Sequence, residues 1–568
     1  MKTFCKILAC LLAAVMFLTV VASCGSSDSD KTEETAKTGE QSTAAPTENP
    51  TGEQTGEQTG EQSTAAPTEN PTGEPTATTG EQPADGKPVI NETFDGAEIN
   101  FFVNGGESDS VNSRSIALLP DEEGNPPDMD YAVNQQTQRR NDTVEDELDV
   151  KIILKRIGTM QGSVDELKPI LAAEEYVYDV IGLYQYFDLT LAIGDTVGAF
   201  VNYQKMPEGV KSYINLDAPY WNQALYNTLM YKDTCFFLTG DICQANVGTM
   251  FVSFVNARMW NDYKEEIAKL PESGGFGDIY EIVNNGYWTL DLWIKLADLC
   301  YNDTNKSETV DRDDQLGVIS YNETLNNMTV EYFSAGSTVM YTELDELGVP
   351  QPTFNSQRNT NFFNKLYTLY CETNTCKMPW DDDVNILDVF AAGNVLATVN
   401  VLGYSELYLA EMKDDFYVMP IPMYEHNQYN PSLPSKGYTT GIGDSVNQYA
   451  ICVDAGVDKI PAITATLELM GYYSKEWVTP AYYDVALKNR YTCNEQDAAI
   501  IDMTHAGIYS CFGAVWSGCL GNPTWWIRTN YANNRNLSRS LKTQNNSLTL
   551  QLKKLLQNIE EAWYINKV

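Results

Sequence analysis

The stretch that decides the fold is Ala97–Asn104, AEINFFVN, which alternates in the manner of a β-strand. Two further apolar segments read as strands, Val150–Ile157 (VKIILKRI) and Tyr178–Tyr184 (YDVIGLY). Helix-favouring segments separate the three, at about 131–148 and at 164–173. Strand–helix–strand–helix–strand order predicts a parallel α/β sheet.

Working outward from this unit, the ends of the strands predict where a ligand binds. In open α/β sheets, ligands bind beyond the carboxyl ends of the strands. This rule selects Asn104 and Gln185, and also Asp241, which follows the strand Thr234–Leu238. A carboxylate such as Asp241 accepts charge-assisted hydrogen bonds from hydroxyl groups. Each of the three also suits a cap or turn. Trp221 is a further candidate ligand contact, and it suits either an exposed loop or the local core.

A second α/β series begins near residue 288. Thr289 is a good N-cap for a helix that runs to Leu299. Strands are predicted within 314–318, 395–399, 416–420 and 447–453, and amphipathic helices at 460–473 and 548–563.

Several local motifs occur in a characteristic order along this part of the chain. They are Thr239–Ile242 (TGDI), Trp288–Leu292 (WTLDL), Asp314–Val318 (DQLGV), Phe390–Val395 (FAAGNV), Val418–Pro422 (VMPIP) and Pro480–Lys488 (PAYYDVALK). In this order the chain resembles the family 1, maltodextrin-binding type of extracellular solute-binding proteins of ABC transporters. The resemblance covers nearly all of 96–568.

The resemblance implies a two-lobed periplasmic-binding-protein fold of type II, with lobes joined by crossing strands and ligand between them. Lobe one is expected to comprise 96–256 and 444–500, and lobe two 257–443 and 501–568. The lobes are expected to close on the ligand by hinge motion. Loops longer than in simpler members prevent transfer of the pocket's shape.

The resemblance also points to aromatic ligand contacts on lobe two. The stretch that matches the position of the family's stacking aromatics is Asn400–Tyr404, which selects Tyr404. A later aromatic is expected before the final helices, where either Trp516 or the pair Trp525 and Trp526 qualifies. Trp and Tyr suit sugars because they combine an apolar face with a polar tip.

The N-terminus has the pattern of a bacterial lipoprotein. Lys2 and Lys6 precede an uncharged apolar run that is short for a membrane span. The run ends in Val21-Ala22-Ser23-Cys24, which resembles a lipobox. We therefore expect a signal peptide at 1–23, lipidation of Cys24, and anchoring by acyl chains.

Residues 24–95 are predicted to be a disordered tether. The sixteen residues TGEQSTAAPTENPTGE occur twice, at Thr38–Glu53 and Thr59–Glu74. They contain almost no apolar surface with which to offset chain entropy.

Composition narrows the function further. A net charge of −41, from 37 basic and 78 acidic residues, opposes binding to nucleic acid. Only two histidines, His426 and His505, argue against His-based triads and zinc sites. The acidic turn containing Asp311, Asp313 and Asp314 does not require calcium, so we expect no metal and no cofactor.

The cysteines leave two alternatives open. Removal of the signal and lipidation of Cys24 leave nine of the twelve cysteines. Cys371 with Cys376, and Cys511 with Cys519, have spacings that suit short-loop disulfides, whereas buried free thiols suit the sequence equally.

The sequence thus predicts a monomeric, non-enzymatic lipoprotein on the extracellular face of the cell membrane. It is expected to bind a carbohydrate, most simply an oligosaccharide, and to deliver it to ABC permease subunits. The alternatives are a peptide-binding or solute-sensing protein of the same fold, and a secreted glycoside hydrolase.

Overall fold

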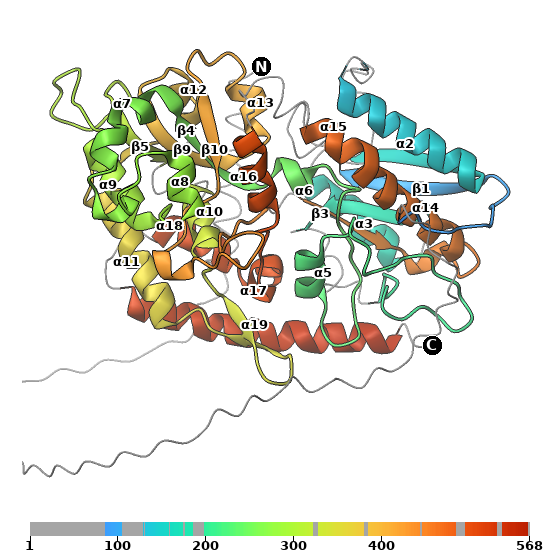
Figure 1. The fold of residues 1–568 in the computed structure, drawn as a ribbon. Coiled ribbons are helices and arrows are strands. Elements are labelled where there is room, and N and C mark those ends of the chain that lie inside the picture. The colour runs from blue at the N-terminus through green and yellow to red at the C-terminus, as the bar shows by residue number, and fades with distance from the viewer. Residues whose placement is uncertain are drawn as a thin grey trace, which may run out of the picture. The chain divides into compact units, whose positions relative to one another are not determined.

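The computed structural model describes residues 86–104, 129, 131–157, 160–173, 177–185, 198–321, 328–379, 384–442, 446–483, 495–530 and 537–565. All of these residues belong to one compact unit, Thr78–Val568 (Figure 1). The expected signal peptide and Cys24 lie outside the described residues.

The first sheet is the one that the opening stretch predicts. Its strand order is β11-β3-β1-β2, and its strands are β1 (Ala97–Asn104), β2 (Val150–Ile157), β3 (Val180–Tyr184) and β11 (Asn447–Ile451). β1 pairs in parallel with β2 and with β3, whereas β11 is antiparallel to β3. The parallel pairing of the first three strands confirms the sequence prediction.

The second sheet has the order β10-β4-β9-β5-β8. Its strands are β4 (Phe251–Asn256), β5 (Leu316–Tyr321), β8 (Cys376–Met378), β9 (Val395–Val401) and β10 (Phe416–Met419). β5 is parallel to β8 and β9, and β4 is antiparallel to β9 and β10. A separate hairpin pairs β6 (Thr342–Leu344) with β7 (Pro350–Pro352).

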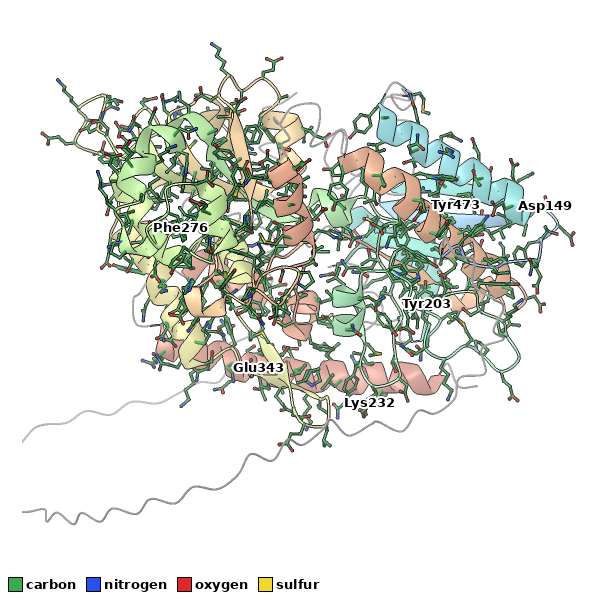
Figure 2. The ribbon with its side chains drawn as sticks, viewed as in Figure 1. Asp149, Tyr203, Lys232, Phe276, Glu343 and Tyr473 are labelled. Atoms are coloured by element: carbon green, nitrogen blue, oxygen red, sulfur yellow. The ribbon has the colours of Figure 1, made fainter. Side chains whose placement is uncertain are left out.

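Helices flank both sheets (Figures 1 and 2). The longer ones are α2 (Ala132–Leu148), α3 (Met160–Ala172), α7 (Ala257–Ile267), α9 (Leu290–Leu299), α10 (Met328–Gly336), α11 (Gln357–Cys371), α14 (Ile460–Tyr473), α16 (Glu495–His505), α18 (Pro523–Asn530) and α19 (Ser538–Ile565). The shorter ones are α5 (Gln223–Leu229), α6 (Ala245–Gly248), α8 (Ile279–Asn284), α12 (Ile386–Ala391), α13 (Tyr404–Tyr408), α15 (Thr479–Tyr483) and α17 (Phe512–Val515). Short 3₁₀ turns lie at Pro271–Ser273, His426–Gln428, Val453–Ala455 and Ser517–Leu520 (η7), and a π-helical turn (η5) at Ser474–Val478.

Local sequence explains why these helices begin where they do. The hydroxyl of Thr289 accepts a hydrogen bond from the backbone N–H of Leu292 at 3.4 Å, as expected for an N-cap of α9. Ser356 caps α11 in the same way, through the N–H of Asn359 at 3.1 Å. The apolar face of α9 is then buried, including Trp293.

The chain crosses between the two sheets at residues 250 and 442. Met250 and Ile442 form an antiparallel bridge, and the N–H of Phe251 donates to the carbonyl of Gly441 at 3.0 Å. β4 follows at once and pairs within the second sheet, so the crossing lies before β4. The expectation that lobe one extends to Asn256 stays a prediction, and the pairing of β4 with β9 and β10 favours an end of that lobe near Met250.

Two further boundaries of the expected lobes differ in the structure. α16 packs on β10 of the second sheet, although residues 495–500 were assigned by sequence to lobe one. Its Asp497 accepts a hydrogen bond from the Tyr280 hydroxyl at 2.5 Å. At the other end, residues 86–95 of the expected tether contact α2. Lys87 forms an ion pair with Glu147 of this helix at 2.8 Å. Neither contact is visible in local composition.

Within the described residues, no helix combines the length and the apolar character that a membrane span requires. Eight described cysteines carry free thiols, including all four that were considered for short-loop disulfides.

Candidate functional site

A pocket lies where the two sheets meet, and strand ends from both sheets border it. Gln185 directly follows β3 of the first sheet, and Phe251 begins β4 of the second. The pocket has an open mouth and a cavity volume of about 80 Å³, which is below the range of roughly 300–1,000 Å³ that small-molecule sites occupy. The lining residues are Gln185, Leu225, Phe251, Glu331, Ser334, Ala335, Val339, Tyr341, Gly441, Ile442, Tyr509, Ser510, Cys511, Ala514, Val515, Ser517, Gly518, Thr524 and Trp525.

Gln185 forms the polar wall on the side of the first sheet. Its side-chain oxygen accepts a hydrogen bond from the Gln448 amide at 3.1 Å, which orients the group. Its amide nitrogen lies 3.4 Å from the carbonyl oxygen of Val515, at the end of α17. Gln185 therefore touches elements from both sides of the pocket.

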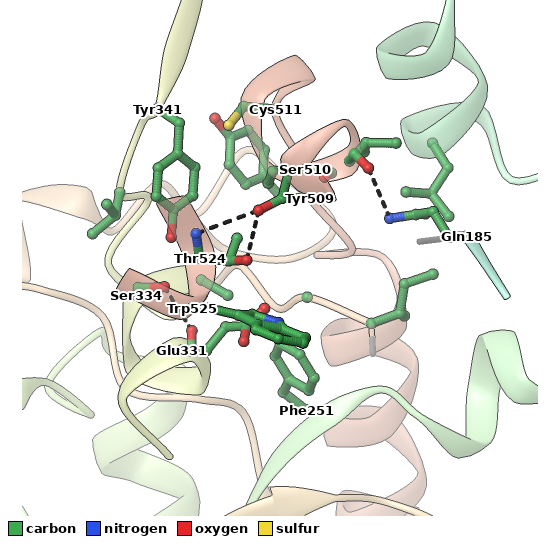
Figure 3. A pocket seen from close by; sticks show the side chains of 18 of the residues that line it. Gln185, Phe251, Glu331, Ser334, Tyr341, Tyr509, Ser510, Cys511, Thr524 and Trp525 are labelled. Atoms are coloured by element: carbon green, nitrogen blue, oxygen red, sulfur yellow. Dashed lines mark hydrogen bonds between the residues drawn. The ribbon is translucent and has the colours of Figure 1, made fainter. Parts of the chain in front are cut away.

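Trp525 supplies an aromatic surface on the opposite side. It lies on α18, is half-buried, and projects into the pocket (Figure 3). The guanidinium carbon of Arg528 lies 5.8 Å from the centre of its ring, in the range of a cation–π contact.

A buried ion pair adjoins this aromatic surface. The Nε of Arg528 donates to the Oε2 of Glu331 at 2.8 Å, and its Nη2 donates to the same oxygen. Glu331 lines the pocket, whereas Arg528 stands behind it and is almost wholly buried. The negative charge at the pocket is thus compensated from within the protein.

Hydroxyl groups make up most of the remaining polar lining. Ser334, on α10, donates to the carbonyl oxygen of Glu331 at 2.7 Å. Ser517 and Thr524 bond to each other at 2.7 Å. Tyr341 and Tyr509 add two phenols, and burial raises the pKa of both, so each stays protonated. The hydroxyl of Tyr509 donates to the sulfur of Met340. Hydroxyls, an amide and an aromatic face are the groups that a sugar can match.

Two of the residues selected from sequence, Trp221 and Trp516, lie in the core. The indole N–H of Trp221 donates to Glu468 at 3.2 Å, and the ring is 2% exposed. Trp516 stacks on Phe512 with ring centres 5.5 Å apart and does not line the pocket. For these two, packing rather than ligand contact explains the tryptophan. Trp526 is half-buried and packs against the core, on Phe354.

Asp241 and Tyr404, also selected from the sequence, lie apart from the pocket lining. Asp241 accepts a hydrogen bond from the Thr479 hydroxyl at 3.0 Å, and burial raises its pKa to about 6. Tyr404 begins α13 after β9 and lies 5.6 Å from Tyr408 between ring centres. Asn104 ends β1, but its side chain lies outside the described part of the chain. The pocket thus includes Gln185 and Trp525 from the selected set.

Most pocket residues were missed because their types are ordinary and their positions are scattered. One signal was available: residues 508–526, IYSCFGAVWSGCLGNPTWW, combine hydroxyl and aromatic side chains at high density. Glu331, Ser334 and Tyr341 carry no such signal. In the described ranges, no group of three or more His, Cys, Asp or Glu side chains is placed to hold a metal ion.

Comparison with solved structures addresses the fold. The cyclic α-maltosyl-1,6-maltose binding protein of Arthrobacter globiformis superposes with a TM-score of 0.50 at 10% identity, over 81% of this chain and 99% of that chain. A cyclo/maltodextrin-binding protein complexed with maltotetraose gives 0.48 at 12% identity, over 82% and 96%. UspC of M. tuberculosis gives 0.48 at 11% identity, over 80% and 100%.

Comparison by sequence adds nothing to this. No family model matches the chain. No curated protein matches it either. At these identities the similarity to the Arthrobacter protein establishes architecture. The chain has the two-lobed α/β fold of the extracellular solute-binding proteins, as its sequence predicts.

Proposed function

We propose that this protein is an extracellular solute-binding lipoprotein that captures a carbohydrate, most simply an oligosaccharide, and delivers it to an ABC importer. The observation that carries this proposal is the pocket at the meeting of the two sheets. It presents a tryptophan face opposite an amide, with hydroxyls between them.

The chemistry of the pocket suits a neutral sugar. The half-buried face of Trp525 can stack on the C–H face of a pyranose ring. Gln185 and the serine, threonine and tyrosine hydroxyls can exchange hydrogen bonds with ring hydroxyls. Glu331 is the one carboxylic acid among the described lining residues, and Arg528 compensates its charge. The name of the Arthrobacter protein, which records an oligosaccharide ligand, supports the same class.

Binding would couple to closure of the two lobes. Gln185 and Val515 already meet across the pocket, and the chain passes between the sheets near Met250 and Ile442. A ligand that contacts both walls favours the arrangement in which they are close. We propose lobes that follow the two sheets, with 444–483 in lobe one and 495–568 in lobe two.

The anchor and the location follow from the N-terminal sequence. Lipidation of Cys24 would hold the protein at the outer face of the cell membrane. The repeated Thr-, Glu- and Gly-rich segment would act as a flexible tether between anchor and binding domain.

Hydrolysis is disfavoured by the make-up of the pocket. Glycoside hydrolases generally use two carboxyl groups about 5–10 Å apart, and Glu331 has no second carboxylate beside it among the described lining residues. Peptide binding and solute sensing keep the same fold and differ in ligand or partner.

Isothermal titration against a panel of neutral trisaccharides and tripeptides tests the proposal. We expect wild-type protein to bind at least one saccharide, and Trp525→Ala to lower its affinity about 5- to 100-fold, on the scale of a lost aromatic contact. Trp525→Phe should retain part of it. The matched control is Trp477→Ala, because Trp477 is also half-buried but stacks on Tyr473, away from the pocket. Binding of tripeptides alone, or release of sugar products, would refute the proposal.

A further inference from the structure

One side chain in the pocket has a polar group that the protein leaves unused. Tyr341, the residue before β6, is 3% exposed. Among the described residues, its hydroxyl has no hydrogen-bond partner. Figure 3 shows the hydroxyl directed into the pocket, toward Ser334.

Ser334 does not remove this deficit. An interaction with its hydroxyl lowers the pKa of Tyr341 against the larger effect of burial, but the two hydroxyls do not meet the geometric criteria of a hydrogen bond. The proton of the Ser334 hydroxyl is donated to the carbonyl oxygen of Glu331, at 2.7 Å, and not to the phenol. Buried hydroxyls in native proteins are nearly always satisfied, so an unsatisfied one at a pocket wall calls for an explanation.

The tyrosine cannot easily turn away to find another partner. Its ring lies 5.1 Å from the ring of Phe354 between centres. Its Cβ lies so close to the backbone of Gly513 that a Cβ on that glycine would approach it to 2.6 Å. The N–H of Gly513 also donates to the hydroxyl of the next residue, Thr342, at 2.8 Å. The phenol is therefore held pointing at the space where a ligand would lie.

We propose that Tyr341 determines ligand specificity: its hydroxyl bonds a hydroxyl of a neutral pyranose unit that lies deep in the pocket, beside Trp525. This inference rests on the proposed carbohydrate-binding function. It adds the protein group that forms a hydrogen bond with the buried end of the sugar. A sugar lacking an oxygen at that position would leave the phenol unsatisfied and would bind weakly, as sites built around a hydroxyl reject analogues without it.

The test compares Tyr341→Phe with Tyr438→Phe. Tyr438 is equally buried, at 1% exposure, but its hydroxyl donates to the carbonyl oxygen of Val283 at 2.9 Å. The probes are maltotriose, cellotriose, xylotriose and mannotriose, measured by titration calorimetry, and each variant's melting temperature is measured without sugar.

For the trisaccharide that wild type binds most tightly, we expect Tyr341→Phe to bind about 10- to 100-fold more weakly. Its melting temperature without sugar should stay level or rise, since an unsatisfied buried group is removed. Tyr438→Phe should show the reverse, with unchanged affinity and a lower melting temperature.

Two results would overturn the inference while leaving the proposed function intact. One is wild-type affinity in Tyr341→Phe. The other is a fall in its melting temperature as large as that of Tyr438→Phe, which would show that the phenol is bonded inside the protein. If wild type binds none of the four sugars, both this inference and carbohydrate binding by this pocket are refuted.

Discussion

Replacing Glu468 by glutamine should change how the stability of the protein depends on pH. Glu468 lies on α14 and is 1% exposed. Tyr220 donates its hydroxyl to one carboxyl oxygen, and the indole N–H of Trp221 donates to the other at 3.2 Å. Burial nonetheless raises the pKa of Glu468 from 4.5 to about 8.

The sign follows from which state holds the proton. Between about pH 4.5 and 8 the folded protein keeps Glu468 protonated, whereas the unfolded chain ionises it. The folded state then binds more protons, so the free energy of unfolding falls as pH rises. The slope is about 1.4 kcal/mol per pH unit, or roughly 3 kcal/mol between pH 5 and 7.5.

Glu468→Gln removes this slope. Glutamine has one acceptor oxygen where the carboxyl group has two, so one of the two donors loses its partner. The variant should therefore carry a pH-independent cost of about 1–3 kcal/mol.

Urea denaturation of wild type and Glu468→Gln at four pH values between 5 and 8 measures the effect. The stability of the variant relative to wild type should rise by about 3 kcal/mol across this range. A difference that stays constant across the range would refute the assignment of a protonated Glu468, whatever its size. Comparing the two proteins cancels the titration of other groups, including Asp241.

Three further predictions follow from the pocket and the core. Arg528→Met should lower the free energy of unfolding by about 3–5 kcal/mol, because it removes the cation that compensates the half-buried carboxylate of Glu331. Adding Glu331→Gln should restore part of this stability; no restoration in denaturant unfolding would contradict the pairing. Trigalacturonate should bind at least about 10-fold more weakly than a neutral trisaccharide at low salt, because the net charge of −41 repels anions; equal affinities in calorimetry would contradict this. Iodoacetamide on native protein at pH 8 should label the half-buried Cys371 and Cys519 first. Cys235, Cys300 and Cys376 should react later, because burial raises the pKa of each thiol to about 12. Peptide mapping that finds these three buried cysteines labelled first would refute the prediction.

The strands could be predicted from the sequence because the pattern of apolar residues that marks each strand is local. The alternation of Ala97–Asn104 gives the observed β1 to the residue, and Val150–Ile157 gives β2. Thr289 was recognisable as a cap because its role depends on residues three positions away. α3 shows the limit of such rules, since it continues through Pro169 to Ala172.

The pocket was less readable because it is assembled from segments far apart in the chain. The strand-end rule found Gln185, since the end of a parallel strand is a local feature. Among the late tryptophans, Trp525 lines the pocket, Trp516 is buried in the core, and Trp526 is half-buried and packs against the core. That difference depends on which face of each helix packs against which neighbouring element, and this packing cannot be predicted from composition.

The boundaries of the lobes show the same limit. β4 was assigned to lobe one because it follows that lobe in sequence, yet it pairs with β9 and β10 of the second sheet. Residues 86–95 are assigned to the tether, yet Lys87 forms an ion pair with Glu147, sixty residues away. Long-range pairings decide both cases.

Hydrogen–deuterium exchange of the full chain with and without a bound trisaccharide tests the central claim most directly. Sugar should slow exchange together in the peptides that carry Gln185, residues 331–341 and residues 509–525, while the outer helix α2 stays unchanged. Slowed exchange confined to one side of the pocket, or found only elsewhere in the protein, would contradict a binding site shared by the two lobes.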